Sequence, residues 1–399
     1  MNVTRRPFLR AGERVKQARE EGKVPGVVLE ELLAPGAAAG VRLEDLLRKV
    51  ESGDRVTPAE GLWLLTQAPL IDLGEMARTW RFRHNPAHQV TFVIDTNPNY
   101  TNYCDADCLF CAFYRKPGDA QGYAHSVEHL MKLVGRSVKL GATTVLLQGG
   151  LNPDLQLDYY INVVSAFGEQ FPQVHPHLWS APEIGKMSEV SGSSYEEVLS
   201  ALFAAGQRTM PGGGAEILSD RVRARISAKK QSVVEWLDIH RIAHAQGFKT
   251  TATMMYGHAE QAADIIEHLE CVRRLQDETG GFTAFIPWSY KPGNTPMQGQ
   301  FPEYPGPAVY LRILALARIY LDNFQHIQAS WFSDGKKPGQ VALHFGADDF
   351  GGTLIEENVL HEAAHNVETT TEETLAIIRE AGFVPARRRT PLYDVVETY

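Results

Sequence analysis

The chain has 399 residues, of which 44% are hydrophobic and 22% are charged, proportions typical of a globular protein. A formal net charge of −9 argues against a protein that binds nucleic acid through phosphate contacts. No apolar run approaches the roughly eighteen residues of a membrane helix, and residues 1–23 are too charged for a signal peptide. We therefore expect a cytoplasmic protein whose partners include neither nucleic acid nor a membrane.

The first ninety residues divide into two parts. Residues 1–40 are rich in charge and then in Ala, Gly and Pro, which predicts a peripheral or mobile extension. Residues 41–89 are predicted to form a helical segment packed on the main domain, with short amphipathic helices at 43–50 and 57–66. Thr57 is expected to cap the second helix, because Pro58 suits the first helical position.

From residue 90 to 399, short β-branched or aromatic runs alternate with longer amphipathic stretches. This rhythm is typical of a parallel sheet with crossover helices. Eight strand–helix units predict an α/β fold of the (β/α)8 TIM-barrel type, followed by C-terminal helices, and a doubly wound sheet is the competing topology. The predicted strands are 90–95, 144–148, 174–180, 208–210, 250–256, 283–287, 327–331 and 342–345.

Three of the four cysteines lie close together, as Cys104, Cys108 and Cys111 in a C-x3-C-x2-C pattern. Iron–sulfur clusters normally take four thiolates, so three would leave one iron open to a ligand. Structural zinc would need a fourth ligand at a fixed spacing, and the nearest downstream histidine is His125. Three clustered cysteines cannot all pair as disulfides. The pattern predicts a cluster-binding loop, whereas Cys271 is predicted to pack inside a helix.

The remaining candidate functional motifs follow predicted strands. In a parallel barrel the loops after the strands carry the functional residues. Each motif alone is a weak signal, because Gly and Asp also mark ordinary turns. After the cysteine loop the motifs are Gln148-Gly-Gly150, Pro182-Glu183, Pro211-Gly-Gly-Gly-Ala-Glu216, Tyr256-Gly-His-Ala-Glu260, Trp288-Ser-Tyr-Lys-Pro-Gly-Asn-Thr295, Trp331-Phe-Ser-Asp334 and Gly346-Ala-Asp-Asp-Phe-Gly-Gly352.

The cysteine pattern, with Phe110 before the last cysteine and a barrel strand before the loop, resembles the radical S-adenosylmethionine superfamily. The resemblance implies a 4Fe-4S cluster on Cys104, Cys108 and Cys111 whose open iron chelates the amino and carboxylate groups of S-adenosylmethionine. An electron from an external low-potential donor would then cleave the sulfonium to a 5′-deoxyadenosyl radical. A closed barrel mouth would shield that radical from water.

Further strings resemble the dehypoxanthine futalosine cyclase family of the futalosine route to menaquinone, from about residue 43 to 393. The relative in the same pathway is aminofutalosine synthase, and Pro287-Trp288 favours the cyclase. The common superfamily motif Gly-Gly-Glu reads Gly149-Gly150-Leu151 here, which leaves open what holds the methionine amine. The strings include Asn99-Tyr-Thr-Asn-Tyr-Cys104, Phe110-Cys-Ala-Phe-Tyr-Arg115, Thr251-Ala-Thr-Met-Met-Tyr-Gly257 and Glu356-Glu-Asn358.

The resemblance also implies roles in cofactor binding. Aromatic residues after the cysteines would line the adenine, the glycine-rich end of strand two would bind methionine, and carboxylates would take ribose hydroxyls or the ammonium group. Packing, a tight turn or a carboxylate at a helix N-terminus are the ordinary alternatives. The candidates are Phe113, Tyr114, Gln148, Gly149, Gly150, Glu183, Glu216, Gly257 and Glu260.

The family's substrate carries a benzoate, a ketone and a ribose that lacks its base. Arg115 and Lys291 are candidates for the anion, and Trp288 and Trp331 for the flat ring. His258 and His344 are candidate proton acceptors, although a lone histidine is more often structural. The candidates for the hydroxyl groups are Asn294, Asp348, Asp349 and Asn358.

The resulting hypothesis is an enzyme that cyclises dehypoxanthine futalosine. The 5′-deoxyadenosyl radical would abstract a hydrogen from the ribose, at C4′ by family analogy, and the carbon radical would add to the benzoate ring. Loss of one electron and one proton would restore aromaticity. The alternatives are an aminofutalosine synthase and, from a different class, a non-catalytic zinc- or cluster-binding protein.

Overall fold

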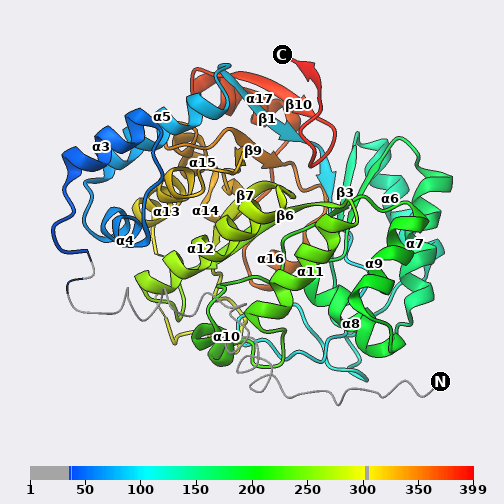
Figure 1. The fold of residues 1–399 in the computed structure, drawn as a ribbon. Coiled ribbons are helices and arrows are strands. Elements are labelled where there is room, and N and C mark those ends of the chain that lie inside the picture. Colours follow the sequence, from blue (N-terminus) through cyan, green and yellow to red (C-terminus); the bar gives the residue numbers. More distant parts are fainter. Residues whose placement is uncertain (1–35, 37, 302–304) are drawn as a thin grey trace.

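The computed structural model describes residue 36, residues 38–301 and residues 305–399. Most of the predicted extension at 1–40 therefore lies outside the described residues. The following segment contains helices α3 (Leu43–Ser52), α4 (Pro58–Thr66) and α5 (Leu70–His84). As predicted, Thr57 caps α4, and its hydroxyl accepts a hydrogen bond from the Glu60 amide. The three helices lie to one side of the barrel (Figure 1), and the Trp80 indole donates to the Ile319 carbonyl of α13 (Pro307–Tyr320) at 2.8 Å.

The strands close into a ring, so the barrel topology is confirmed and the doubly wound sheet is excluded. Its first strand is made of β1 (Gln89–Val93) and β2 (Asp95–Thr96), and β2 begins a parallel sheet in the order β2-β3-β4-β5-β6-β7-β8. A parallel bridge from Gln328 to Asp349 joins the end of that sheet to β9 (Asp349–Gly352), which pairs in parallel with β1. The other ring strands are β3 (Thr144–Leu147), β4 (His175–Leu178), β5 (Thr209–Met210), β6 (Lys249–Tyr256), β7 (Phe282–Ser289) and β8 (His326–Ile327).

The predicted eighth strand at 342–345 is wrong. Lys336–Ala342 forms helix α15, the chain then turns, and the eighth ring strand is β9. A short apolar run cannot by itself distinguish a strand from a buried helix end. The sequence of β9, Asp-Phe-Gly-Gly, lacks β-branched residues, and its pairing with β1 shifts register between Thr91 and Phe92. The seventh strand also stops early, because Trp331 begins α14 (Trp331–Asp334).

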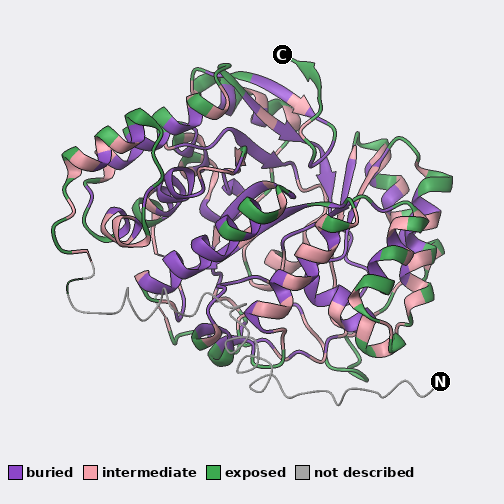
Figure 2. Ribbon diagram, in the orientation of Figure 1, coloured by how far each residue is buried: buried purple, intermediate pink, exposed green. Residues whose placement is uncertain are grey.

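Helices cover the outside of the ring, and the strands are buried (Figure 2). Ser126, Ser194 and Ser232 cap three of these helices with their side chains, which explains where the helices begin. Cys271 is buried inside α12, as predicted. The outer helices are α6 (Val127–Lys139), α7 (Leu157–Gln170), α8 (Ala181–Ser191), α9 (Tyr195–Ala205), α10 (Asp220–Ile226), α11 (Val233–Ala245), α12 (Ala262–Thr279) and α13.

The C-terminal segment returns to the first strand of the ring. After α16 (Asn358–Glu362) and α17 (Thr371–Glu380), β10 (Val384–Arg388) pairs in parallel with β1, and β11 (Val395–Thr398) pairs antiparallel with β10. The Thr144 hydroxyl of β3 donates to the Arg389 carbonyl at 2.6 Å. The segment therefore fills the space where β1 and β3 diverge. Among the described residues, no helix is both long enough and apolar enough to cross a membrane.

Candidate functional site

A cavity of about 360 Å³ lies within the barrel, and it brings together residues from nearly every part of the ring. The cysteine loop borders it, together with the ends of β3, β5, β6 and β7, while the C-terminal segment adds Arg388, Pro391 and Tyr393. The predicted site residues that line the cavity are Cys104, Cys108, Cys111, Phe113, Tyr114, Gln148, Gly149, Gly150, Glu216 and Trp288.

The cysteine loop is held in place by its own backbone and by Arg115. The Cys104 amide donates to the Arg115 carbonyl at 2.9 Å, and the Leu109 amide donates to the Ile226 carbonyl at 2.9 Å. The Arg115 guanidinium donates to the carbonyls of Ala112, Phe113 and Tyr114 and pairs with Glu362 at 2.8 Å. Arg115 was a candidate for binding the substrate anion, but here it holds the end of the loop and does not line the cavity.

Two glycines at the end of β3 make room for this loop. A Cβ atom on Gly150 would lie 2.1 Å from the Tyr103 carbonyl oxygen, and one on Gly149 would lie 2.6 Å from the Tyr100 ring. The Gly150 amide also donates to the Thr101 carbonyl at 2.9 Å. Bare backbone at this strand end therefore accommodates the cysteine loop itself, in addition to any ligand.

The surroundings of the three thiols fit a cluster. Burial raises the pKa of each thiol, to about 12 for Cys108, so a bound metal must displace the protons. The backbone amides of Ala106 and Leu151 lower the pKa of Cys104 and favour its thiolate, although burial has the larger effect. In the described part of the chain, no three His, Cys, Asp or Glu side chains are placed to hold one metal ion. In a 4Fe-4S cluster each thiolate binds a different iron, so the sulfurs need not converge on a single point.

A buried ion pair lies next to the loop. Lys230 donates to Glu216 at 2.8 Å, both residues line the cavity, and the ammonium lies 5.2 Å from the centre of the Phe110 ring. The charge of Lys230 also favours the Cys108 thiolate. Glu216 was a candidate for ribose or ammonium binding, and its carboxylate already has this partner. It sits at φ 45°, a left-handed conformation that few non-glycine residues adopt.

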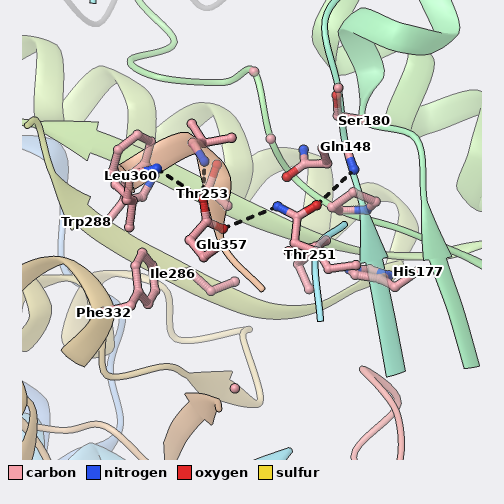
Figure 3. A pocket seen from close by; sticks show the side chains of 18 of the residues that line it. Gln148, His177, Ser180, Thr251, Thr253, Ile286, Trp288, Phe332, Glu357 and Leu360 are labelled. Atoms are coloured by element: carbon pink, nitrogen blue, oxygen red, sulfur yellow. Dashed lines mark hydrogen bonds between the residues drawn. The ribbon is translucent and has the colours of Figure 1, made fainter. Parts of the chain in front are cut away.

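Two sides of the cavity differ in polarity (Figure 3). The apolar side chains of Trp288, Ile286 and Phe332 gather on one side, and Gln148, Ser180 and His177 lie on the other. No hydrogen bond joins the Gln148 side-chain amide to another residue in the described part of the chain, so its donors and acceptor can reach a ligand. A flat apolar ring and a polar group therefore have separate places in the same cavity.

Two carboxyl groups that sequence reasoning missed also line the cavity. Glu357 accepts from the amides of Val359 and Leu360 and from the Asn97 side chain, and Asp95 accepts from the Leu354 amide at 2.8 Å. Burial raises the pKa of Glu357 and raises that of Asp95 to about 6. The adjacent Glu356-Glu-Asn358 string had drawn attention to Asn358, but Asn358 donates to Asn99 outside the cavity lining.

Other missed residues of the lining include His177, Lys230, Gln328 and Phe332. His177 carried a usable signal, since it lies on a predicted strand whose alternate residues face inward. Lys230 carried none, because it comes from the loop between α10 and α11, which is distant in sequence from the cysteines.

Several predicted cofactor residues lie outside the cavity wall. Glu183 forms the capping box of α8 with Ser180 and also accepts from the Tyr100 hydroxyl at 2.9 Å and the Gly149 amide at 3.0 Å. Burial raises its pKa to about 6. Glu260 accepts from the amides of Gly257 and His258, where it shapes the turn after β6. Glu183 thus holds the chain after β3 in place from outside the cavity lining.

The predicted proton acceptors are also engaged elsewhere. His258 is buried, and its ring nitrogens contact the Met255 carbonyl and the Ala259 amide. His344 is exposed, and its ring packs against Phe383 at 5.3 Å. Neither histidine lines the cavity.

The remaining substrate candidates form hydrogen bonds or ion pairs with neighbouring parts of the fold. Lys291 donates to the Ser289 hydroxyl at 2.7 Å, Asn294 donates to the Glu362 carbonyl, and Trp331 donates to the Gly352 carbonyl. Asp348 pairs with Arg318 and His326, and Asp349 pairs with Arg388. None of these five candidate residues, Lys291, Asn294, Trp331, Asp348 and Asp349, lines the cavity.

Comparison with known proteins gives matches along nearly the whole described chain. The model of the radical SAM superfamily matches residues 98–272, and that of the CofH/MqnC C-terminal region matches residues 279–398. The chain is 41% identical over 357 residues to a cyclic dehypoxanthine futalosine synthase of Streptomyces coelicolor, with 89% of each chain covered.

Relatives named for other activities have similar identity. A 5-amino-6-(D-ribitylamino)uracil–L-tyrosine 4-hydroxyphenyl transferase of Methanopyrus kandleri is 42% identical over 78% of this chain and 85% of its own. An aminodeoxyfutalosine synthase of Thermus thermophilus is 39% identical over 87% of this chain and 94% of its own. The crystal structure of HydG, a maturase of FeFe-hydrogenase, has the same fold with a TM-score of 0.72 at 16% identity, covering 91% of this chain and 80% of its own.

Proposed function

The chain belongs to the radical SAM superfamily, in the family of the cyclic dehypoxanthine futalosine synthases and their CofH/MqnC relatives, and we propose that it cyclises dehypoxanthine futalosine. One observation carries the proposal: a single cavity joins the three cysteines to a wall suited to an aromatic ring. Cys104, Cys108 and Cys111 would hold a 4Fe-4S cluster, with S-adenosylmethionine on its open iron. When bound, this pair supplies a 5′-deoxyadenosyl radical that takes a hydrogen atom from the substrate's ribose.

The residues of the chain then act mainly by positioning. Trp288 and Phe332 confine the benzoate ring so that one ring carbon faces the ribose carbon radical, and they keep water and other hydrogen donors away. Holding the two reacting carbons together supplies much of the rate enhancement, because it replaces an encounter in solution. The carbon–carbon bond forms between parts of one substrate molecule, so its conformation in the cavity decides the product.

The benzoate carboxylate needs hydrogen-bond donors. In the described part of the chain, the lysine and arginine that line the cavity are Lys230 and Arg388, and each is already paired with a carboxylate, Glu216 and Asp349 respectively. We therefore assign carboxylate recognition to neutral donors, chiefly the side-chain amide of Gln148. This choice also avoids an excess positive charge in a buried site.

The test is anaerobic reconstitution with iron and sulfide, followed by reductant, S-adenosylmethionine and dehypoxanthine futalosine. We expect a cyclised product that lacks two hydrogens, together with 5′-deoxyadenosine. Parallel reactions receive an enolpyruvyl benzoate, or tyrosine with 5-amino-6-(D-ribitylamino)uracil, which are the reactants expected for the two kinds of relative. Turnover of either in place of dehypoxanthine futalosine, with intact cluster absorbance, overturns the proposal. Zinc without iron after anaerobic purification would indicate the non-catalytic alternative.

A further inference from the structure

His177 begins a short row of hydrogen-bonding groups that leads away from the cavity. It lines the cavity, and it is the one histidine that does so in the described part of the chain. Its Nδ1 lies 2.9 Å from the Thr209 hydroxyl oxygen, which in turn lies 2.7 Å from Nε2 of His175. His177 is 6% exposed, whereas His175 is only partly buried. The row therefore connects the cavity wall with a more accessible part of the barrel.

The geometry follows from strand pairing. His175 and His177 are two residues apart on β4, so their side chains lie on the same face. Thr209 on β5 pairs in register with His177. A hydroxyl can accept from one ring and donate to the other at the same time. With Nδ1 of His177 donating and Nε2 of His175 accepting, Nε2 of His177 presents a lone pair to the cavity.

The charge states of the two rings suit a proton acceptor. Burial lowers the pKa of His177 well below its usual value and that of His175 to about 4, so both rings are neutral near pH 7. Arg388 and His175 also disfavour the charged form of His177, and Asp394 favours that of His175. A proton taken up at His177 is therefore more stable once it has passed to His175, whose charged form the Asp394 carboxylate favours.

The proposed cyclisation creates a need for such a route. When the ribose carbon radical adds to the ring, a carbon–carbon bond forms and the attacked carbon becomes tetrahedral. Aromaticity returns when the adduct gives one electron to an acceptor of the iron–sulfur class and loses the proton from that carbon, whose bonding pair stays in the ring. We propose that Nε2 of His177 accepts this proton and that Thr209 and His175 conduct it out of the cavity.

The two carboxyl groups in the cavity are less suited to this task. The partners of Asp95 and Glu357 are backbone amides and the Asn97 side chain, and amide protons do not relay charge readily. A weak base is sufficient here, because a ring that has lost its electron is a strong acid. The inference depends on the proposed function, since it assigns the last step of that reaction.

The experiment follows cyclisation of dehypoxanthine futalosine that is deuterated at the ring position from which the proton departs. In the native enzyme we expect no isotope effect from this step. Thr209→Val interrupts the row, and we expect kcat to fall about tenfold with an unchanged KM and a primary isotope effect to appear. His177→Asn is expected to lower kcat by about 100-fold, the usual scale of general base catalysis, while 5′-deoxyadenosine is still released without product.

Matched variants separate this role from a structural one. Thr209→Ser retains the hydroxyl and is expected to recover most of the rate and lose the isotope effect. Thr283→Val removes a strand hydroxyl that donates to the Thr250 carbonyl outside the cavity, and it is expected to behave like the native enzyme. Thr209→Val is used only if it folds with normal iron content. Otherwise the same rates and isotope effects are measured in His175→Asn, which changes the accessible end of the row.

The outcomes are distinguishable. If the native enzyme releases 5′-deoxyadenosine but forms no cyclised product, the proposed function fails and the relay fails with it. If the native enzyme cyclises the substrate and the Thr209→Val and His175→Asn variants show native rates and no isotope effect, the relay is overturned and the proposed function stands. An isotope effect that appears only in Asp95→Asn would assign the proton to Asp95 and would also overturn the relay.

Discussion

The Lys230 ammonium donates to the Glu216 carboxylate at 2.8 Å beside the cysteine loop, where the Glu216 side chain is 5% exposed and that of Lys230 13%. Burying two charges is costly unless each satisfies the other. Their mutual attraction raises the pKa of Lys230, which therefore stays charged next to Cys108. A fixed positive charge at this position stabilises thiolates and the anionic cluster that they would bind.

Breaking that pair should be costly. Lys230→Met leaves the Glu216 charge buried without a partner, and we expect a loss of about 3–5 kcal/mol in the free energy of unfolding. Chemical denaturation measures the change. The double variant Lys230→Met/Glu216→Met should recover much of the loss, because no unpaired charge remains. The control is Lys132→Met, whose pair with Glu128 is exposed on α6, and it should change stability by less than about 1 kcal/mol.

The cysteines should divide into two classes. Replacement of Cys104, Cys108 or Cys111 by Ser should abolish cluster binding, measured as iron and sulfide per chain and as visible absorbance after anaerobic reconstitution. Cys271→Ala should bind iron normally, because that side chain is buried in α12. Normal iron content in any of the three loop variants would contradict the assignment of that residue as a ligand.

The glycine at the end of β3 should be required for the cysteine loop. Gly150→Ala places a methyl group 2.1 Å from the Tyr103 carbonyl oxygen, so the loop must move. We expect iron incorporation to fall several-fold and the melting temperature to decrease. Gly168→Ala is the matched control, since that exposed position in α7 has open space around it. Alanine there should be neutral or stabilise the helix by up to about 1 kcal/mol.

Asp95 should make stability depend on pH. Burial raises its pKa from 3.8 to about 6, so between these values the folded state binds more protons than the unfolded state. Stability from this group is therefore greatest below pH 3.8 and declines as the pH rises to about 6, by about 3 kcal/mol in total. Asp95→Asn cannot ionise and should lack this decline. Unfolding free energies of both proteins across pH 4–7 measure the difference, and equal slopes would show that Asp95 does not titrate in this range.

Local sequence was sufficient for much of the fold. The alternation of strands and amphipathic helices predicted the barrel, and Thr57-Pro58 predicted the start of α4. The eighth strand was misplaced, because its sequence Asp-Phe-Gly-Gly has no strand signal and forms a strand only through pairing with β1. The C-terminal strand β10 was missed because its partner β1 is distant in the sequence, and β11 was missed with it, since β11 pairs with β10.

The sequence by itself determined the cluster-binding loop with which the proposed reaction would start. Three cysteines at a fixed spacing on one loop are a local pattern, so they can be recognised without the fold. The tertiary structure alone decided which other residues share a cavity with them. It placed Glu357, His177, Lys230 and Phe332 in the cavity wall and left Asp348, Asp349 and Lys291 in contacts elsewhere. The physical reason is that a ligand is surrounded by side chains from many strand ends, and contacts between segments distant in the sequence decide which of these side chains meet.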